Sequence, residues 1–148
     1  IEVIFHMREA LVRWTGGMAF EARVSSGHTI VMDASREVGG EDSGPRPGEL
    51  LLAALGGCTG MDIVSILQKM RVDFDRVEVA VEAEAREEYP KYYDRFRVIY
   101  RVFGNDVPAD KVKRAVQLSE ERYCSVGALF SHGARITHRI EINGEPVE

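Results

Sequence analysis

Two cysteines, Cys58 and Cys124, are the side chains of this sequence best suited to redox chemistry, and they are the only cysteines among its 148 residues. In a reducing compartment so few cysteines are typical of free, catalytic or metal-bound thiols rather than of structural disulfides. The pair would suit a thiol peroxidase. A thiolate at Cys58 would attack a peroxide oxygen to give a sulfenic acid, and Cys124 would condense with it to a disulfide that an external dithiol reduces.

Two other interpretations of the cysteines stay open. Cys58 would be inert if it were simply a small buried side chain, because free cysteine is among the most buried residue types. Against this, Gly56, Gly57 and Gly60 surround it, and each glycine costs a helix about 1 kcal/mol relative to alanine, which favours a partner or ligand close to the thiol. A metal site is the other alternative, but the histidines lack the spacing of zinc motifs relative to the cysteines, so we expect no metal. These histidines are His28, His132 and His138.

The element that must position Cys58 is a helix predicted over Pro47 to Met70. It is apolar on nearly every side, which is typical of a helix buried inside a protein. Charged residues and glycines interrupt it too often for a membrane span, which needs roughly 20 mostly apolar residues. We therefore expect a central buried helix with Cys58 near its middle, and no membrane partner.

Alternating apolar and polar residues predict short strands on both sides of this helix. A second helix is expected to begin near Asp106 or Val107, with Tyr123 on its inward face, and a short third helix near Val126. The order of elements is not a regular strand–helix alternation, so the sequence predicts an α+β fold with antiparallel sheets packed around the central helix. The predicted strands are Arg8–Trp14, Met18–Val24, His28–Met32, Val77–Ala85, Arg95–Phe103 and Arg135–Ile142, followed by a frayed acidic tail.

Two further segments could contribute to a site. Asp33 to Arg46 has no periodicity and leads directly into the cysteine helix, and long irregular segments of this kind are either binding loops or plain surface connections. Cys124 is expected at a helix–helix junction, with Ser125 capping the third helix. A helix N-terminus favours negative charge and can lower the pKa of a thiol.

Composition restricts the class of protein further. The net charge of −5 and 45% apolar content are typical of a soluble globular protein and argue against nucleic-acid binding, which depends on cationic residues. We expect a cytoplasmic protein with one domain, residues 7–148, because we recognise no signal peptide. Residues 1–6 are predicted to derive from cloning, with Met7 as the native start.

Two motifs resemble those of the OsmC/Ohr family of osmotically induced and organic-hydroperoxide-resistance proteins. They are the segment PGELLLAALGGC ending at Cys58, followed by Asp62, and the segment YCSV around Cys124. The resemblance covers nearly the whole chain from Met7. It implies an intertwined homodimer with two active sites at the subunit interface. It also implies a peroxidatic Cys58, a resolving Cys124, organic hydroperoxide substrates and a lipoyl-type dithiol as reductant.

The sequence departs from the well-studied members of that family at two positions. Those members carry a glutamate just before the helix and an arginine after the first hairpin glycines, whereas Gly48 and Met18 stand at these places here. Glu49 comes one residue later, and Arg46 and Arg36 are candidate replacements for the arginine that stabilises the thiolate. Without a cation, a thiol on an apolar helix has its pKa raised and reacts slowly.

We therefore predict a dimeric, cofactor-free thiol peroxidase with Cys58, Cys124, Arg46 and Glu49 as candidate site residues. The alternative is a stress protein of the same fold that binds a small apolar molecule and turns over little peroxide. The retained cysteine pair favours the enzyme, and the missing arginine and glutamate favour the binding protein.

Overall fold

The structure, a computed structural model, describes residues 8–148, so the predicted cloning residues 1–6 and the start at Met7 lie outside it. The chain forms two compact units, residues 1–50 and residues 51–148, which are described separately. The boundary falls inside the central helix. The prediction of a single domain over 7–148 stays a prediction.

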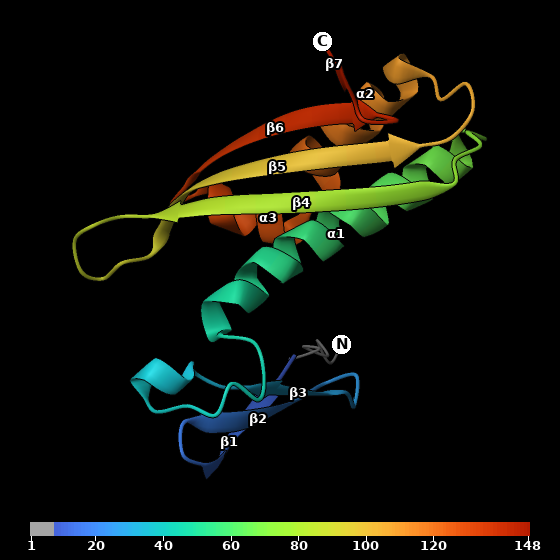
Figure 1. Ribbon diagram of the computed structural model, residues 1–148. Coiled ribbons are helices and arrows are strands. Elements are labelled where there is room, and N and C mark those ends of the chain that lie inside the picture. Colours follow the sequence, from blue (N-terminus) through green and yellow to red (C-terminus); the bar gives the residue numbers. More distant parts are fainter. Residues whose placement is uncertain (1–7) are drawn as a thin grey trace, which may run out of the picture. The chain divides into compact units, whose positions relative to one another are not determined.

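The first unit contains a three-stranded antiparallel meander formed by β1 (Ala10–Gly16), β2 (Ala19–Val24) and β3 (Thr29–Met32), coloured blue in Figure 1. These strands confirm the three predicted from alternation. Within the described part of this unit, Ala22 is the one buried apolar residue. The sheet therefore has almost no core of its own.

The predicted irregular segment after β3 is largely irregular but is held in place at its base by a carboxylate. It contains one short 3-10 helix, Arg36–Val38. Asp33 is buried, and it accepts hydrogen bonds from the backbone N–H groups of Glu41 and Ser43 and from the Ser43 hydroxyl. Gly40 is required beside it, because any Cβ there would collide with the Ala34 carbonyl. The segment is thus an ordered loop.

Helix α1 (Pro47–Lys69) confirms the predicted central helix, but only one of its faces is buried in the chain. The buried residues recur every fourth position, which is the spacing of one helix face: Leu55, Thr59, Ile63 and Leu67. On the opposite side of the helix Met61 is 76% exposed. The expectation of a helix buried all round is therefore not met within one chain, because the sheet covers only one side of it.

By length and composition alone α1 could also cross a membrane, with a mean hydropathy of 1.9 over an 18-residue window. Core helices of soluble proteins pass the same test. Here the Asp62 carboxylate of α1 accepts a hydrogen bond from the buried Ser119 hydroxyl. One face of α1 thus packs inside the second unit, with Leu55, Ile63 and Leu67 in its buried cluster.

The second unit contains a four-stranded sheet in the order β4 (Arg76–Ala85), β5 (Tyr93–Phe103), β6 (Arg135–Ile142) and β7 (Glu145–Val147). The expectation of purely antiparallel sheets is wrong for one pair, because β5 and β6 are parallel. A long helical connection joins them, and such a crossover permits parallel pairing. The acidic tail is also not frayed as predicted: it turns at Asn143–Gly144 and returns as β7 beside β6.

Three helical segments connect β5 to β6. They are α2 (Ala109–Leu118), a π-helical turn (Ser119–Tyr123) and α3 (Ser125–Ser131). Pro108, rather than Asp106 or Val107, is the N-cap of α2. Tyr123 is 54% exposed and not inward-facing as predicted, because the wider π turn changes the helical phase before it is reached.

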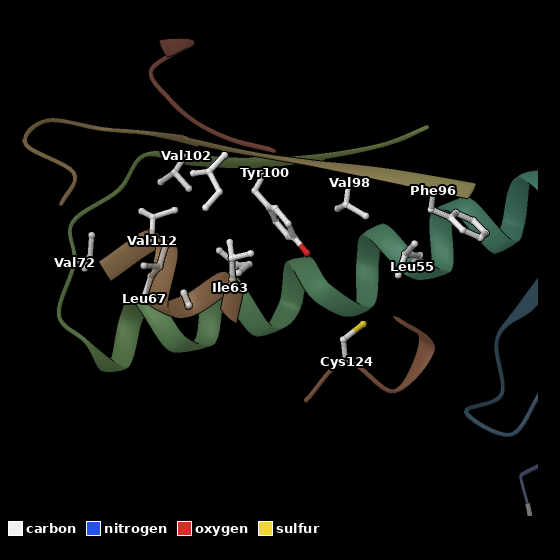
Figure 2. Close-up of a cluster of buried hydrophobic side chains, with 13 residues drawn as sticks. Leu55, Ile63, Leu67, Val72, Phe96, Val98, Tyr100, Val102, Val112 and Cys124 are labelled. Atoms are coloured by element: carbon white, nitrogen blue, oxygen red, sulfur yellow. The ribbon is translucent and has the colours of Figure 1, made fainter. Parts of the chain in front are cut away.

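The core of the second unit lies between α1 and one face of the sheet. Val98, Tyr100 and Val102 point from β5 towards α1, and Val112 of α2 closes the far end (Figure 2). Cys124 belongs to the same buried cluster. The packing that stabilises this unit therefore also fixes the position of one of the two candidate thiols.

Candidate active site

The two cysteines, far apart in the sequence, meet where the middle of α1 lies beside the start of α3. Cys58 is partly exposed, Cys124 is 4% exposed, and both are free thiols. The Cys58 sulfur lies 3.9 Å from the hydroxyl oxygen of Ser125, the first residue of α3. The structure thus brings together the two thiols that the sequence singled out.

The surroundings of Cys58 favour its ionised form. Partial burial raises the pKa of the Cys58 thiol, but hydrogen bonds outweigh this effect and hold the pKa below its ordinary value. The donors are the backbone N–H of Val126, the Cys124 thiol, and the hydroxyl and backbone N–H of Ser125. Neutral donors therefore favour the thiolate here, where the sequence analysis expected a guanidinium.

Cys124 is held in the opposite state. Burial raises the pKa of the Cys124 thiol to about 11, and the neighbouring charges of Cys58 and Asp62 act in the same direction. Its sulfur is the N-cap of α3 and accepts a hydrogen bond of 3.3 Å from the backbone N–H of Gly127. The N-cap predicted for Ser125 is therefore wrong by one residue. At neutral pH Cys124 therefore keeps its proton, and Cys58 is the more acidic thiol of the pair.

A cavity of about 180 Å³ lies behind Cys124. Its lining combines apolar side chains with four residues that carry side-chain oxygen atoms, Thr59, Tyr100, Glu120 and Ser131. Gly127 is part of the wall, and a Cβ there would lie 3.2 Å from the Cys124 sulfur. The glycine therefore leaves the space in which this sulfur can act as a cap.

A chain of hydrogen bonds runs through the core beside this cavity. The Thr59 oxygen lies 3.0 Å from the Tyr100 hydroxyl and 2.7 Å from the Ser119 hydroxyl. Ser119 donates to Asp62 at one end. At the other end Tyr100 donates to Glu120, whose second carboxylate oxygen lies 3.0 Å from Nδ1 of His138. The chain connects buried hydroxyls to a partly exposed carboxylate and imidazole.

The two other predicted site residues, Arg46 and Glu49, belong to the first unit. Arg46 forms an ion pair with Asp42 and donates to the Gly44 carbonyl, and Glu49 is exposed in the first turn of α1. Glu49 lies nine positions before Cys58 in the sequence, and the two residues belong to different units. The roles predicted for Arg46 and Glu49 therefore stay predictions.

The alternatives considered for the histidines find no support in the part of the chain that is described. Among residues 8–148 no three side chains of His, Cys, Asp or Glu are grouped so as to hold a metal ion. His28 contacts the Ser26 hydroxyl and His138 contacts Glu120. Arg36, the other candidate cation, is exposed in the short 3-10 helix of the first unit.

Sequence reasoning missed Thr59, Tyr100 and Glu120 as parts of the site. Thr59 follows Cys58 directly, and a hydroxyl on the buried face of an apolar helix was the signal that could have identified it, since a buried hydroxyl needs a partner. Tyr100 lies on the apolar face of a strand and carries the only side-chain hydroxyl among the apolar residues of that face. Glu120 lies in the π turn, where a regular helical wheel misplaces it.

Comparison with known proteins gives concordant results. A model of the OsmC-like protein family matches residues 40–139. Protein YhfA of Escherichia coli K12 is 40% identical over 134 residues, which cover 90% of this chain and 97% of YhfA. The crystal structure of a hypothetical protein from Aquifex aeolicus VF5 has a TM-score of 0.81 at 28% identity, covering 94% of this chain and 98% of that one.

The fold is also that of a named resistance protein. The crystal structure of an organic hydroperoxide resistance protein OsmC from Legionella pneumophila has a TM-score of 0.67 and covers 93% of this chain and 98% of its own. Its sequence identity is 15%, so this likeness concerns the fold alone.

Proposed function

We propose that this chain, which belongs to the OsmC-like protein family, is a cysteine-based peroxidase that reduces organic hydroperoxides. The observation that carries the proposal is the contrast between its two thiols. Cys58 is partly exposed and stabilised as a thiolate, and the protonated Cys124 lies within hydrogen-bonding reach of it. This is the arrangement that a nucleophile and a resolving thiol require.

The reaction would proceed in three steps. The Cys58 thiolate attacks the outer oxygen of the hydroperoxide, the O–O bond breaks, and the alkoxide leaves and takes up a proton to form an alcohol. Cys124 then attacks the Cys58 sulfenic acid, forming the disulfide and releasing water. An external dithiol, of lipoyl type by analogy with the family, reduces the disulfide and completes the cycle. No metal or organic cofactor takes part.

The same proposal includes a homodimer in the cytoplasm. The exposed side of α1 is apolar around Met61, and Gly57 has open space where a side chain would be. An apolar face with room for a second backbone suits packing against the same helix of a partner subunit. We expect a partner subunit to cover this face, and we expect no nucleic-acid or membrane partner.

The second candidate is a binding protein of the same fold with little peroxidase activity. The observation in its favour is that Met18 and Gly48 stand where related enzymes carry an arginine and a glutamate, while Arg46 is already paired with Asp42. The donors that lower the pKa of Cys58 are neutral, and they stabilise a thiolate less than a guanidinium does, so attack on the peroxide would be slower.

Intact mass separates the two candidates. The reduced protein is treated with cumene hydroperoxide, and a peroxidase should lose two hydrogens as the Cys58–Cys124 disulfide forms. Cys58→Ser should abolish this change. Cys124→Ser should replace it with a gain of oxygen at Cys58. If the mass of the wild-type protein does not change, the peroxidase proposal is wrong and the binding protein remains.

A further inference from the structure

Cys124 faces a difficulty that the proposed reaction must solve. Its thiol is 4% exposed and has to lose a proton when it forms the disulfide. Burial disfavours the free thiolate, and little solvent reaches the sulfur directly. A group inside the protein must therefore accept the proton as the new bond forms.

The cavity behind Cys124 contains one carboxylate that can do this. Glu120 lines the same cavity as Cys124, and the hydroxyl-bearing residues Tyr100 and Thr59 line it too. Figure 2 shows the Cys124 sulfur and the Tyr100 hydroxyl on the same side of the sheet, next to α1. The cavity volume of about 180 Å³ exceeds the roughly 30 Å³ of one water molecule, so water can connect groups that do not touch.

Glu120 is also placed to pass a proton outwards. One carboxylate oxygen accepts a hydrogen bond of 3.3 Å from the buried Tyr100 hydroxyl. The other lies 3.0 Å from Nδ1 of His138, whose side chain is 45% exposed, against 32% for Glu120 itself. The carboxylate thus spans the distance between the cavity and solvent.

We propose that Glu120 accepts the thiol proton of Cys124 across this cavity, through water or the Tyr100 hydroxyl, and delivers it to solvent by way of His138. This inference rests on the proposed function, because it concerns the step in which Cys124 resolves oxidised Cys58. It adds to the reaction a carboxylate in the π turn just before the resolving cysteine.

The Cys124 sulfur attacks the Cys58 sulfur, the S–S bond forms and the S–O bond of the sulfenic acid breaks. The hydroxide that leaves takes up a proton from solvent and becomes water, and the Cys124 proton passes to the Glu120 carboxylate and from there to solvent, so the step consumes no net proton. Transfer to a carboxylate becomes favourable late in the step, because the sulfur loses its basicity as its electron pair enters the new bond.

The other ionisable groups around the two residues do not offer the same route. Cys124 is faced by Cys58, Asp62 and Tyr100, and Glu120 by Tyr100 and His138. Asp62 is held by the Ser119 hydroxyl at the far end of the hydrogen-bond chain. Tyr100 is protonated at neutral pH, because burial raises the pKa of its hydroxyl far above its ordinary value. Glu120 is therefore the carboxylate that both lines the cavity and reaches solvent.

The test treats the reduced protein with Ellman's reagent. Cys58 reacts first, which releases one thionitrobenzoate and leaves a second one attached to Cys58 as a mixed disulfide. Attack of Cys124 on this mixed disulfide releases the second thionitrobenzoate, and the rate of this second release is measured. This step needs the Cys124 proton to leave but no hydroperoxide, so it reports on Glu120 even if the peroxidase proposal fails. Glu120→Gln keeps the shape and the hydrogen bond from Tyr100 but removes the base. Glu121→Gln, in the same turn and bonded to Gln117, is the matched control.

We expect Glu120→Gln to slow the second release roughly 10-fold or more at pH 7, since general bases contribute at least about 100-fold in favourable cases. The first release, which depends on Cys58, should be unchanged. The defect should shrink as the pH is raised, because solvent hydroxide replaces the missing base, and a purely structural effect would not shrink in this way. Thermal unfolding of each variant checks the fold.

Equal second-release rates for Glu120→Gln, Glu121→Gln and the wild type would overturn the inference. A defect of the same size at every pH would also overturn it, since that result assigns Glu120 a structural role only. The cumene hydroperoxide experiment decides separately whether the protein is a peroxidase.

Discussion

The difference in acidity between the two thiols can be tested by alkylating the reduced protein with iodoacetamide at pH 7. The pKa of Cys58 lies below the ordinary value of 9.0 and that of Cys124 is raised to about 11. A separation of at least two units gives Cys58 a thiolate population at least about 100-fold larger. A less basic thiolate is a weaker nucleophile, with a Brønsted coefficient of roughly 0.4–0.5. This effect reduces the expected ratio of the Cys58 alkylation rate to the Cys124 alkylation rate to about 10.

Burial increases this ratio, because Cys124 is 4% exposed and iodoacetamide must reach the sulfur. We therefore expect Cys58 to be alkylated at least about 10-fold faster, as measured by mass spectrometry of the two cysteine peptides over time. In urea the two rates should become similar. Ser125→Ala, which removes one hydrogen-bond donor to Cys58, should slow alkylation of Cys58 and leave that of Cys124 unchanged.

The reasoning would be refuted by equal rates in the folded protein, or by faster labelling of Cys124. Either result would mean that the donors around Cys58 do not outweigh its partial burial. Cys58→Ser serves as the control for cross-talk, because Cys124 should stay slow when its partner thiol is absent.

Three further outcomes are expected. Thr59→Val keeps the shape of the buried side chain but removes its hydrogen bonds with the Tyr100 and Ser119 hydroxyls. The free energy of unfolding measured in urea should therefore fall by about 1–3 kcal/mol. An unchanged free energy of unfolding would show that these hydrogen bonds contribute nothing to stability. Gly127→Ala places a Cβ against the Cys124 sulfur and should slow closure of the disulfide several-fold in the thionitrobenzoate assay, whereas an unchanged rate would show that the sulfur has room to move. The hydrogen bonds of Ser43 and neighbouring groups hold the pKa of Asp33 at about 2, against 3.8 ordinarily. Because the pKa is lowered in the folded state, the ionised Asp33 carboxylate stabilises the fold above about pH 4, and this stabilisation is lost as the pH falls towards 2. Hydrogen exchange at the Ser43 amide should therefore rise over that window in the wild type and not in Asp33→Asn, and a flat profile in the wild type would contradict this account.

The sequence was sufficient for the elements whose pattern is local. Alternation identified the long strands, and the mostly apolar run from Pro47 identified α1. The parallel pairing of β5 and β6 and the return of β7 were missed, because pairing depends on partners far along the chain. The helical connection after β5 did carry a signal for parallel pairing, since crossovers of this length join parallel strands.

The site was predictable only as far as residue type allows. Cysteine is rare and chemically distinctive, so Cys58 and Cys124 could be chosen without a structure. Thr59, Tyr100 and Glu120 are ordinary residue types whose role comes from three different elements meeting at one cavity. The π turn added a second difficulty, because it shifts the phase of the helix for Glu120 and Tyr123.

The position of the Cys124 sulfur as the N-cap of α3 has a consequence for the oxidised protein. A sulfur joined to Cys58 has to turn towards its partner, so the backbone N–H of Gly127 loses its acceptor. The first turn of α3 would then fray, and proteases would cleave there more readily. Limited proteolysis near Gly127 would thus distinguish the oxidation states of the protein without any chemical label.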